Sequence, residues 1–353
     1  MLPTRTRKRL RLPLLIAAAL GLGAFGLWGR IPDPREFTGA LAAADHRWVA
    51  LAAGWQVLSI AAFAVQQRQV LRALGVRLRF GDALAVTLAR TAISISLPAG
   101  AAVSAAYALK QYARRGASRE LGAASMVVSG LGSIAGLALL YVAGGALALT
   151  RDPGTLLQAR PLAVVAALVA VTAGAVVVGR RQARRPPRPT DRDRHDGRVL
   201  RYVRGLLASA RDAWRAGSSL RVRDWAATVL LFALNWVTDL LCLVAACRAV
   251  GLPVGVTALA GMYLGVQVVR QIPLTPGGVG VIDAALVAGL TAVGATAVTA
   301  AAAVVVYRVL SCWALIPLGG LAAVRLRKQP GNKDAAANKD AAANSTGEEL
   351  ATA

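Results

Sequence analysis

The chain has 353 residues, 56% of them hydrophobic, and 41 Lys and Arg against 17 Asp and Glu give it a formal net charge of +24. A mean hydropathy of +0.53 with long apolar runs is typical of a multi-span membrane protein and argues against a soluble enzyme. The basic residues lie mostly in short segments beside the apolar runs, so the charge indicates membrane topology and not a nucleic-acid partner.

The first third of the chain predicts two spans followed by a hairpin. The basic N-terminus, 1–11, precedes an apolar run at 12–28, which we interpret as a retained span with a cytoplasmic N-terminus. A mixed-charge outer loop around Arg35 and Asp45 leads to a second span at 48–67.

Residues 82–109 separate two basic clusters, at 68–79 and 110–119. If both clusters are cytoplasmic, the segment between them must cross the membrane an even number of times. A full helical span needs about 20 residues, so the segment is too short for two crossings. A re-entrant hairpin broken at Pro98 and Gly100, which carries Arg90 into the membrane, fits better.

Two further spans, at 121–149 and 162–178, lead to an arginine-dense cytoplasmic linker at 180–223. Apolar residues recur at helical spacing between 199 and 214. This pattern predicts either an interfacial helix on anionic headgroups or a solvated linker helix, and the sequence does not choose between them.

The second membrane half, 224–324, contains a span at 225–250, a broken stretch at 256–290 and a last span at 296–324. Prolines and glycines at membrane depth leave backbone groups that lipid cannot satisfy, so they predict a backbone break covered by protein or lining a polar cavity. The residues assigned to this break are Pro276, Gly277, Gly278 and Gly280. The polar tail, 325–353, is expected to be a disordered cytoplasmic segment.

The two broken segments resemble each other. Residues 98–103 match 276–281, an offset of 276 − 98 = 178, and 116–118 match 294–296 at the same offset. The first hairpin enters from the cytoplasm and the second from outside, which is the usual indication of an inverted-repeat transporter. We therefore predict an all-α polytopic fold with about six full spans and two re-entrant hairpins; eight full spans is the alternative.

The run from Pro273 to Asp283, with Arg270 before it and Tyr307-Arg308 after it, resembles the flippase-like transmembrane domain of the lysylphosphatidylglycerol synthase family. Members often have glutamate where this chain has Asp283, and an acidic-arginine pair where it has Ser129-Gly130. The resemblance implies transport of a lipid between leaflets, in some members an aminoacylated phosphatidylglycerol. It implies no enzyme activity, because the synthase domain of bifunctional members has no counterpart in this sequence.

Charged groups at membrane depth cost several kcal/mol unless paired or hydrated, so they are the candidate site. The arginines would bind a lipid phosphate, and the aspartates an amino headgroup or a proton, although a structural Arg–Asp pair involving Asp283 is the alternative. Tyr263 and Asn235 are weaker polar candidates. The substrate-binding candidates are Arg270, Asp283, Arg308, Arg90, Asp239, Tyr307 and Gln267.

Other chemistry has little support in the sequence. Neither the three cysteines nor the two histidines form a metal-binding pattern, and no cofactor motif is present, so we expect no metal or cofactor. The expected partners are anionic or aminoacylated phospholipids of a bacterial cell membrane, with both termini cytoplasmic. The competing function is a membrane scaffold that recruits a partner through its basic linker.

Overall fold

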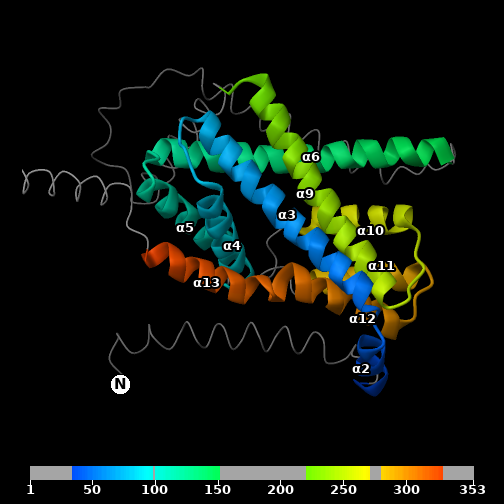
Figure 1. The fold of residues 1–353 in the computed structure, drawn as a ribbon. Helices are drawn as coiled ribbons and strands as arrows, with labels where there is room; N and C mark the ends of the chain where they lie inside the picture. The colour runs from blue at the N-terminus through cyan, green and yellow to red at the C-terminus, as the bar shows by residue number, and fades with distance from the viewer. Residues whose placement is uncertain (1–33, 98–99, 152–219, 271–279, 329–353) are drawn as a thin grey trace, which may run out of the picture.

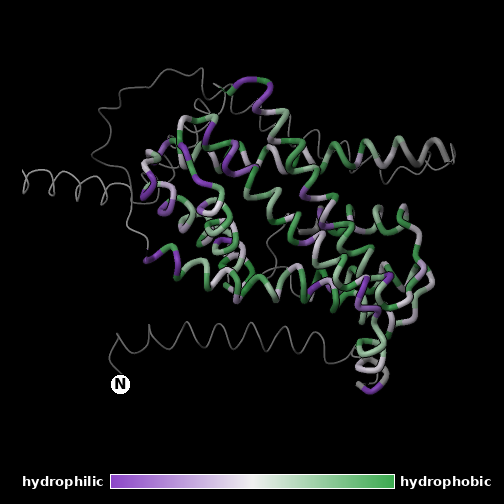
Figure 2. The backbone as a smooth tube through the Cα atoms, in the orientation of Figure 1, coloured by the Kyte–Doolittle hydropathy of each residue, from purple (hydrophilic) through white to green (hydrophobic). Residues whose placement is uncertain are grey.

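The structure is a computed structural model that describes residues 34–97, 100–151, 220–270 and 280–328, and every regular element in these ranges is helical. Within these ranges, four helices are long and apolar enough to cross a membrane: His46–Ala73, Arg119–Ala146, Val222–Ala249 and Ala297–Lys328. The predicted spans at 12–28 and 162–178 and the predicted linker helix lie outside the described residues. Figure 2 shows the apolar character of the helices, with hydrophilic residues gathered at several of their ends.

Helices α3 (His46–Ala73) and α9 (Val222–Ala249) lie side by side and run in opposite directions (Figure 1). Asp45 caps α3 by accepting from the Arg47 N–H, and the backbone N–H of Asp45 donates to the carbonyl of Ala249 at the end of α9. The first turn of one helix therefore contacts the last turn of the other.

The two helices also bond to each other halfway along. Ser59 Oγ donates to the Asn235 carbonyl (3.2 Å), and the Asn235 amide donates back to the Ser59 carbonyl (2.9 Å). Because lipid offers no hydrogen bonds, such reciprocal polar contacts hold membrane helices together and fix their register.

Helices α4 (Phe80–Ser96) and α5 (Gly100–Arg114) pack together as a hairpin whose break falls at the predicted position. A Cβ on Gly100 would lie 2.4 Å from the Ser94 carbonyl oxygen, so only glycine permits this turn. Helix α13 (Leu315–Lys328) covers α4, and a Cβ on Gly319 would lie 2.4 Å from the Leu88 carbonyl oxygen. The hairpin is thus held tightly against the last helix.

Helices α10 (Val256–Arg270) and α11 (Val281–Ala292) occupy the predicted second hairpin, and their connection lies outside the described residues. They pack with α9 and α12 (Ala297–Arg308) around the larger apolar core, which contains Leu243, Leu286 and Leu290. Helix α6 (Arg119–Arg151) packs against α9, where Gly132 and Gly136 meet Phe232.

The last helix joins the two groups. Helix α12, the π-helical turn η3 (Val309–Trp313) and α13 form one apolar helix of 32 residues from Ala297 to Lys328. Helix α12 lies in the larger core, whereas α13 lies against α4, so η3 is where the helix passes from one group to the other. Single π turns within α-helices are frequent at functional sites.

Helices α3 to α6 and α9 to α12 have corresponding boundaries. The starts of α3 and α9 differ by 222 − 46 = 176, and so do the starts of α4 and α10, 256 − 80. The ends of α5 and α11 differ by 292 − 114 = 178, and so do the starts of α6 and α12, 297 − 119. Glycines with positive φ follow at the same offsets: Gly75 with Gly251, and Gly116 with Gly294. The two-residue change in offset falls around the broken segments.

Several predicted boundaries differ from the structure: the second span, predicted at 48–67, belongs to α3, which continues to Ala73. Residues Pro34–Ala42, expected in a loop, form helix α2, because Pro34 suits the first helical turn and Leu41 packs against the larger core. The last helix continues past the predicted end at 324 to Lys328, since Leu326 is only 1% exposed and belongs to the core around α4.

Candidate functional site

Asp239 lies buried in α9, with 6% of its surface exposed. Its Oδ2 accepts hydrogen bonds from the hydroxyls of Tyr263 (2.6 Å) and Tyr307 (3.0 Å) and from the Gln267 amide (3.4 Å). These donors come from α10 and α12, so three helices converge on one carboxylate oxygen. A buried carboxylate is costly, and two hydroxyls and an amide stabilise its charged form.

The side-chain amide of Gln267 also has an oxygen, Oε1, next to its bond with Asp239. Its Oε1 is buried, and among the described residues no donor reaches it. Because the amide nitrogen faces Asp239, the oxygen is left as an acceptor, and a buried acceptor without a donor costs free energy. The group around Asp239 therefore presents acceptor atoms suited to a proton donor or a cationic group.

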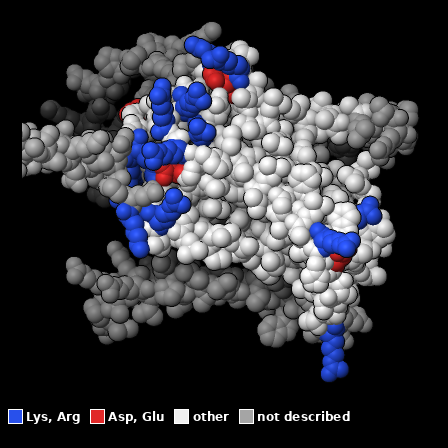
Figure 3. Space-filling model, viewed as in Figure 1, with Lys and Arg blue, Asp and Glu red and all other residues white. Residues whose placement is uncertain are grey.

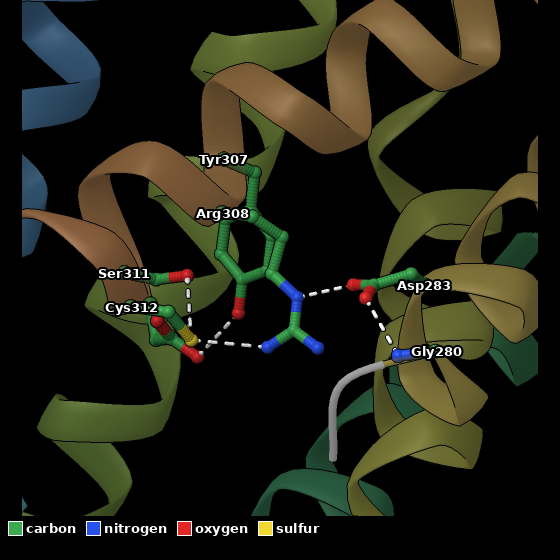
Figure 4. A network of polar contacts seen from close by, with 7 residues as sticks. Gly280, Asp283, Tyr307, Arg308, Ser311 and Cys312 are labelled. Atoms are coloured by element: carbon green, nitrogen blue, oxygen red, sulfur yellow. Dashed lines mark hydrogen bonds and ion pairs between the residues drawn. The ribbon is translucent and has the colours of Figure 1, made fainter. Parts of the chain in front are cut away.

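Arg308 and Asp283 form an ion pair beside this group (Figure 4). Arg308 is the last residue of α12 and is 4% exposed; its Nε donates to Asp283 Oδ1, and its Nη1 donates to the Cys312 sulfur (3.0 Å). Asp283 Oδ2 accepts from the Gly280 N–H (2.9 Å), so the carboxylate also caps α11. Gly280 has φ 84°, which favours glycine at this turn.

The next turn of the helix is η3, which begins at Val309. The side chains of Tyr307 and Arg308 thus reach two different acidic groups, Asp239 and Asp283, from adjacent positions at the end of α12. The hydrogen-bonded carboxylate of Asp239 and the ion pair of Asp283 thus both depend on one backbone segment. Any movement of that segment would change both.

Arg90 lies elsewhere. Its guanidinium is 5.4 Å from the centre of the Phe63 ring, and within the described part of the chain its buried Nη1 has no hydrogen-bond partner. Phe63 and Asp239 each lie four residues beyond the Ser59–Asn235 contact, in opposite directions, so about 12 Å of helix separates them.

Some predicted residues lie outside the described part. Helix α10 ends at Arg270, whose side chain lies outside the described part, as do Pro98, Pro276, Gly277 and Gly278. Gly100 and Gly280 begin or cap helices, as a backbone role requires.

The structure adds a second polar group that the sequence reasoning missed. Gln66 and Gln67 both donate to Ser129 Oγ (3.2 and 3.1 Å), and Tyr112 donates to Gln67 Oε1 (2.9 Å). All four side chains are buried. In the sequence, two adjacent glutamines before Arg68 indicate the polar end of a span. The sequence pattern gave no indication that their side chains are buried.

Helices of membrane-spanning length around a buried charged network define a multi-pass helical membrane protein. Residues 14–319 match the lysylphosphatidylglycerol synthase TM region, and the chain belongs to this family. The resemblance seen in the sequence is thereby confirmed, and a role linked to membrane lipids follows from it. No curated protein is similar to the chain at a significant level.

Proposed function

We propose that the protein moves a lipid headgroup between membrane leaflets, acting as a transporter and not as an enzyme. The cargo is an anionic or aminoacylated phospholipid or a polyprenyl phosphate of a bacterial plasma membrane. The buried network of Asp239, Asp283 and Arg308 carries this proposal. Ionisable groups at membrane depth are rare, and they usually mark substrate or proton pathways.

The two acidic groups have different roles in this proposal. Asp283 holds the guanidinium of Arg308 in place, so the arginine is oriented before a phosphate arrives. Asp239 accepts from the uncharged side chains of Tyr263, Gln267 and Tyr307, and in this proposal it takes up a proton or an amino group. Arg270 and Arg90 would extend the phosphate path from the broken segments.

An inverted repeat supports transport. Ser59 and Asn235 occupy corresponding positions, since 235 − 59 = 176, and they bond reciprocally where two antiparallel helices meet. A residue contacts its own counterpart only on a twofold axis. We infer that this axis relates the two four-helix groups, which would then lie in the membrane with opposite orientations, as in many secondary transporters.

The test is leaflet exchange by the purified full chain in vesicles. Labelled phosphatidylglycerol, lysylphosphatidylglycerol, phosphatidylcholine and a polyprenyl phosphate should be compared, with and without a proton gradient. At least one phosphate-bearing lipid should move faster than in empty vesicles, and Asp239→Asn and Arg308→Gln should each abolish the gain.

Asp82→Asn is the matched control, because Asp82 forms an ion pair with Arg115 away from the network (3.4 Å). It should transport like the unaltered protein. If no lipid moves faster than in empty vesicles, or if Asp239→Asn transports at full rate, the proposal fails and the scaffold function takes its place.

A further inference from the structure

A cavity of about 570 Å³ lies between the last turn of α3 and the first turn of α9. Its charged and polar lining comes from Gln69, Arg72, Arg221, Arg223 and Asp224, which we call the basic junction. The volume is within the range of small-ligand sites, roughly 300–1,000 Å³. Along α9, Asp224 is 15 residues from Asp239, or about 22 Å, so this cavity is separate from the charged network.

The arginines of the basic junction are not paired within the described part of the chain. Among those residues, no carboxylate or carbonyl group pairs with the guanidinium of Arg72, Arg221 or Arg223. Asp224, the one acidic residue in the lining, accepts instead from the Gln69 amide (3.2 Å). Three guanidinium groups around one cavity repel each other, and an anion between them would relieve the repulsion.

A second cavity of about 340 Å³ adjoins the same helix end. It is lined by Arg68, Arg72, Arg77 and Leu78, so Arg72 borders both cavities. On the face seen in Figure 3, the Lys and Arg side chains gather over this end of the molecule, while most of the other described surface in that view is free of charge. With the apolar body in a membrane, the cavity would open at the level of the lipid headgroups.

The other end of the α3–α9 pair provides a comparison. There the start of α3 meets the end of α9, and by the offset of 176 Arg47 corresponds to Arg223 and Arg248 to Arg72. Of the three arginine positions only that of Arg221 differs, because Asp45 stands there at the other end. Gln69 and Asp224 of the basic junction correspond to Ala245 and Trp48. The other end therefore has two arginines and an aspartate where the basic junction has three arginines.

We propose that the basic junction binds the phosphate of an anionic phospholipid from the leaflet on that face. Guanidinium groups bind phosphate oxygens bidentately, and Arg221 and Arg223 stand at the uncapped start of α9, whose free N–H groups also favour an anion. The bound lipid links α3 to α9, in addition to the Gln69–Asp224 bond.

The chain itself supplies the variant that tests this. Arg221 is the N-cap residue of α9 and makes no side-chain cap bond, whereas Asp45 caps α3. Arg221→Asp therefore copies the opposite end of the pair, and aspartate is among the best N-cap residues, so the helix should be stabilised. Loss of lipid binding in this variant cannot then be attributed to loss of the helix.

The experiment is a titration of the purified full chain in neutral detergent with short-chain phosphatidylglycerol, followed by native mass spectrometry. The unaltered protein should retain one tightly bound phosphatidylglycerol, and short-chain phosphatidylcholine should not replace it. Arg221→Asp and Arg72→Gln should each weaken that binding at least tenfold. Arg248→Gln, at the corresponding position of the other end, should leave it unchanged.

Two outcomes would overturn the proposal. Equal weakening by Arg72→Gln and Arg248→Gln would mean that only the overall positive charge attracts the lipid. Displacement of the lipid by millimolar inorganic phosphate would show a site for a free anion and not for a lipid. Neither outcome affects the leaflet-exchange test, because the residues and the readout differ.

Discussion

The two four-helix groups have nearly the same helix boundaries but different polar residues inside. Tyr307 and Arg308 of α12 correspond, at the offset of 178, to Ser129 and Gly130 of α6. Asp283 corresponds to Ala105, and Asp239, at the offset of 176, to Phe63. The first group thus forms the same helices without any of these charges, so the fold does not require them.

The reverse substitution is found as well. Gln66, Gln67 and Tyr112 bond to one another or to Ser129 in the first group, and their counterparts are Cys242, Leu243 and Leu290, all in the larger apolar core. At these three positions the second group buries apolar residues where the first buries polar ones. The counterparts of the charged set are uncharged, and of these Phe63 and Ala105 are half-buried and Gly130 is exposed. The same helices thus form with either kind of residue, which favours a functional reason for the charged set of the second group.

The largest expected effect tests the opposite orientation of the two groups. Arg77→Cys and Arg114→Cys should react with a membrane-impermeant thiol reagent from one side only, and their counterparts Pro253→Cys and Ala292→Cys only from the other. Arg77, Pro253 and Ala292 are exposed, and Arg114 is half-buried. The native thiols Cys242, Cys247 and Cys312 are buried and should react slowly. Labelling of all four from one face would rule out the inverted repeat.

The second largest expected effect is a loss of stability when the carboxylate of Asp283 is removed. Asp283→Ala, which copies Ala105 of the first group, leaves Arg308 buried without its carboxylate and should cost about 3 kcal/mol of unfolding free energy. The double variant Asp283→Ala with Arg308→Met should recover most of this in a reversible denaturation assay, because the uncompensated charge is gone. Transport should remain absent in the double variant. Recovery of transport would reduce the pair to a structural role.

The smallest effect concerns the contact between the two groups. Gly319→Ala should cost about 2 kcal/mol, because its Cβ would be pressed against the backbone and Ala92 of α4. Gly320→Ala is the control: nothing lies within 4 Å of its Cβ, so the helical preference of alanine should make it neutral or slightly stabilising. Thermal unfolding of both variants in detergent measures the difference. Equal melting temperatures would mean that α13 does not pack tightly on α4.

The sequence predicted the parts of the site that carry charge. Asp239, Asp283 and Arg308 stood out because ionisable residues are rare in apolar runs, and the alternative of a pair between Asp283 and Arg308 is the one that the structure contains. The sequence could not show that the hydroxyls of Tyr263 and Tyr307 both donate to one carboxylate oxygen of Asp239, because this arrangement depends on how three helices pack together. Uncharged polar residues carry no such signal, which is why Gln66 and Gln67 were missed.

The helices were also predictable only in part. The break at Pro98 and Gly100 follows from their backbone chemistry, and the structure has helix ends on both sides of it. The offset of 178 was visible because the broken segments share prolines and glycines. The offset of 176 between α3 and α9 was not visible in the sequence. Many different apolar sequences form a helix of 28 residues, so these two helices share no motif that would reveal their correspondence.

The π turn η3 also sets the rotational phase of the last helix. An α-helix turns by about 100° per residue, so the extra residue in this turn fixes how far the face of α13 is rotated relative to α12. In the observed phase, Arg308 faces Asp283 while Gly319 faces α4. If the same residues formed a regular α-helix without the wider turn, Gly319 would be rotated by about 100° relative to Arg308, and one contact would turn away from its partner. With this number of residues between Arg308 and Gly319, the chain therefore needs the π turn to keep both contacts, whatever side chains occupy the positions between them.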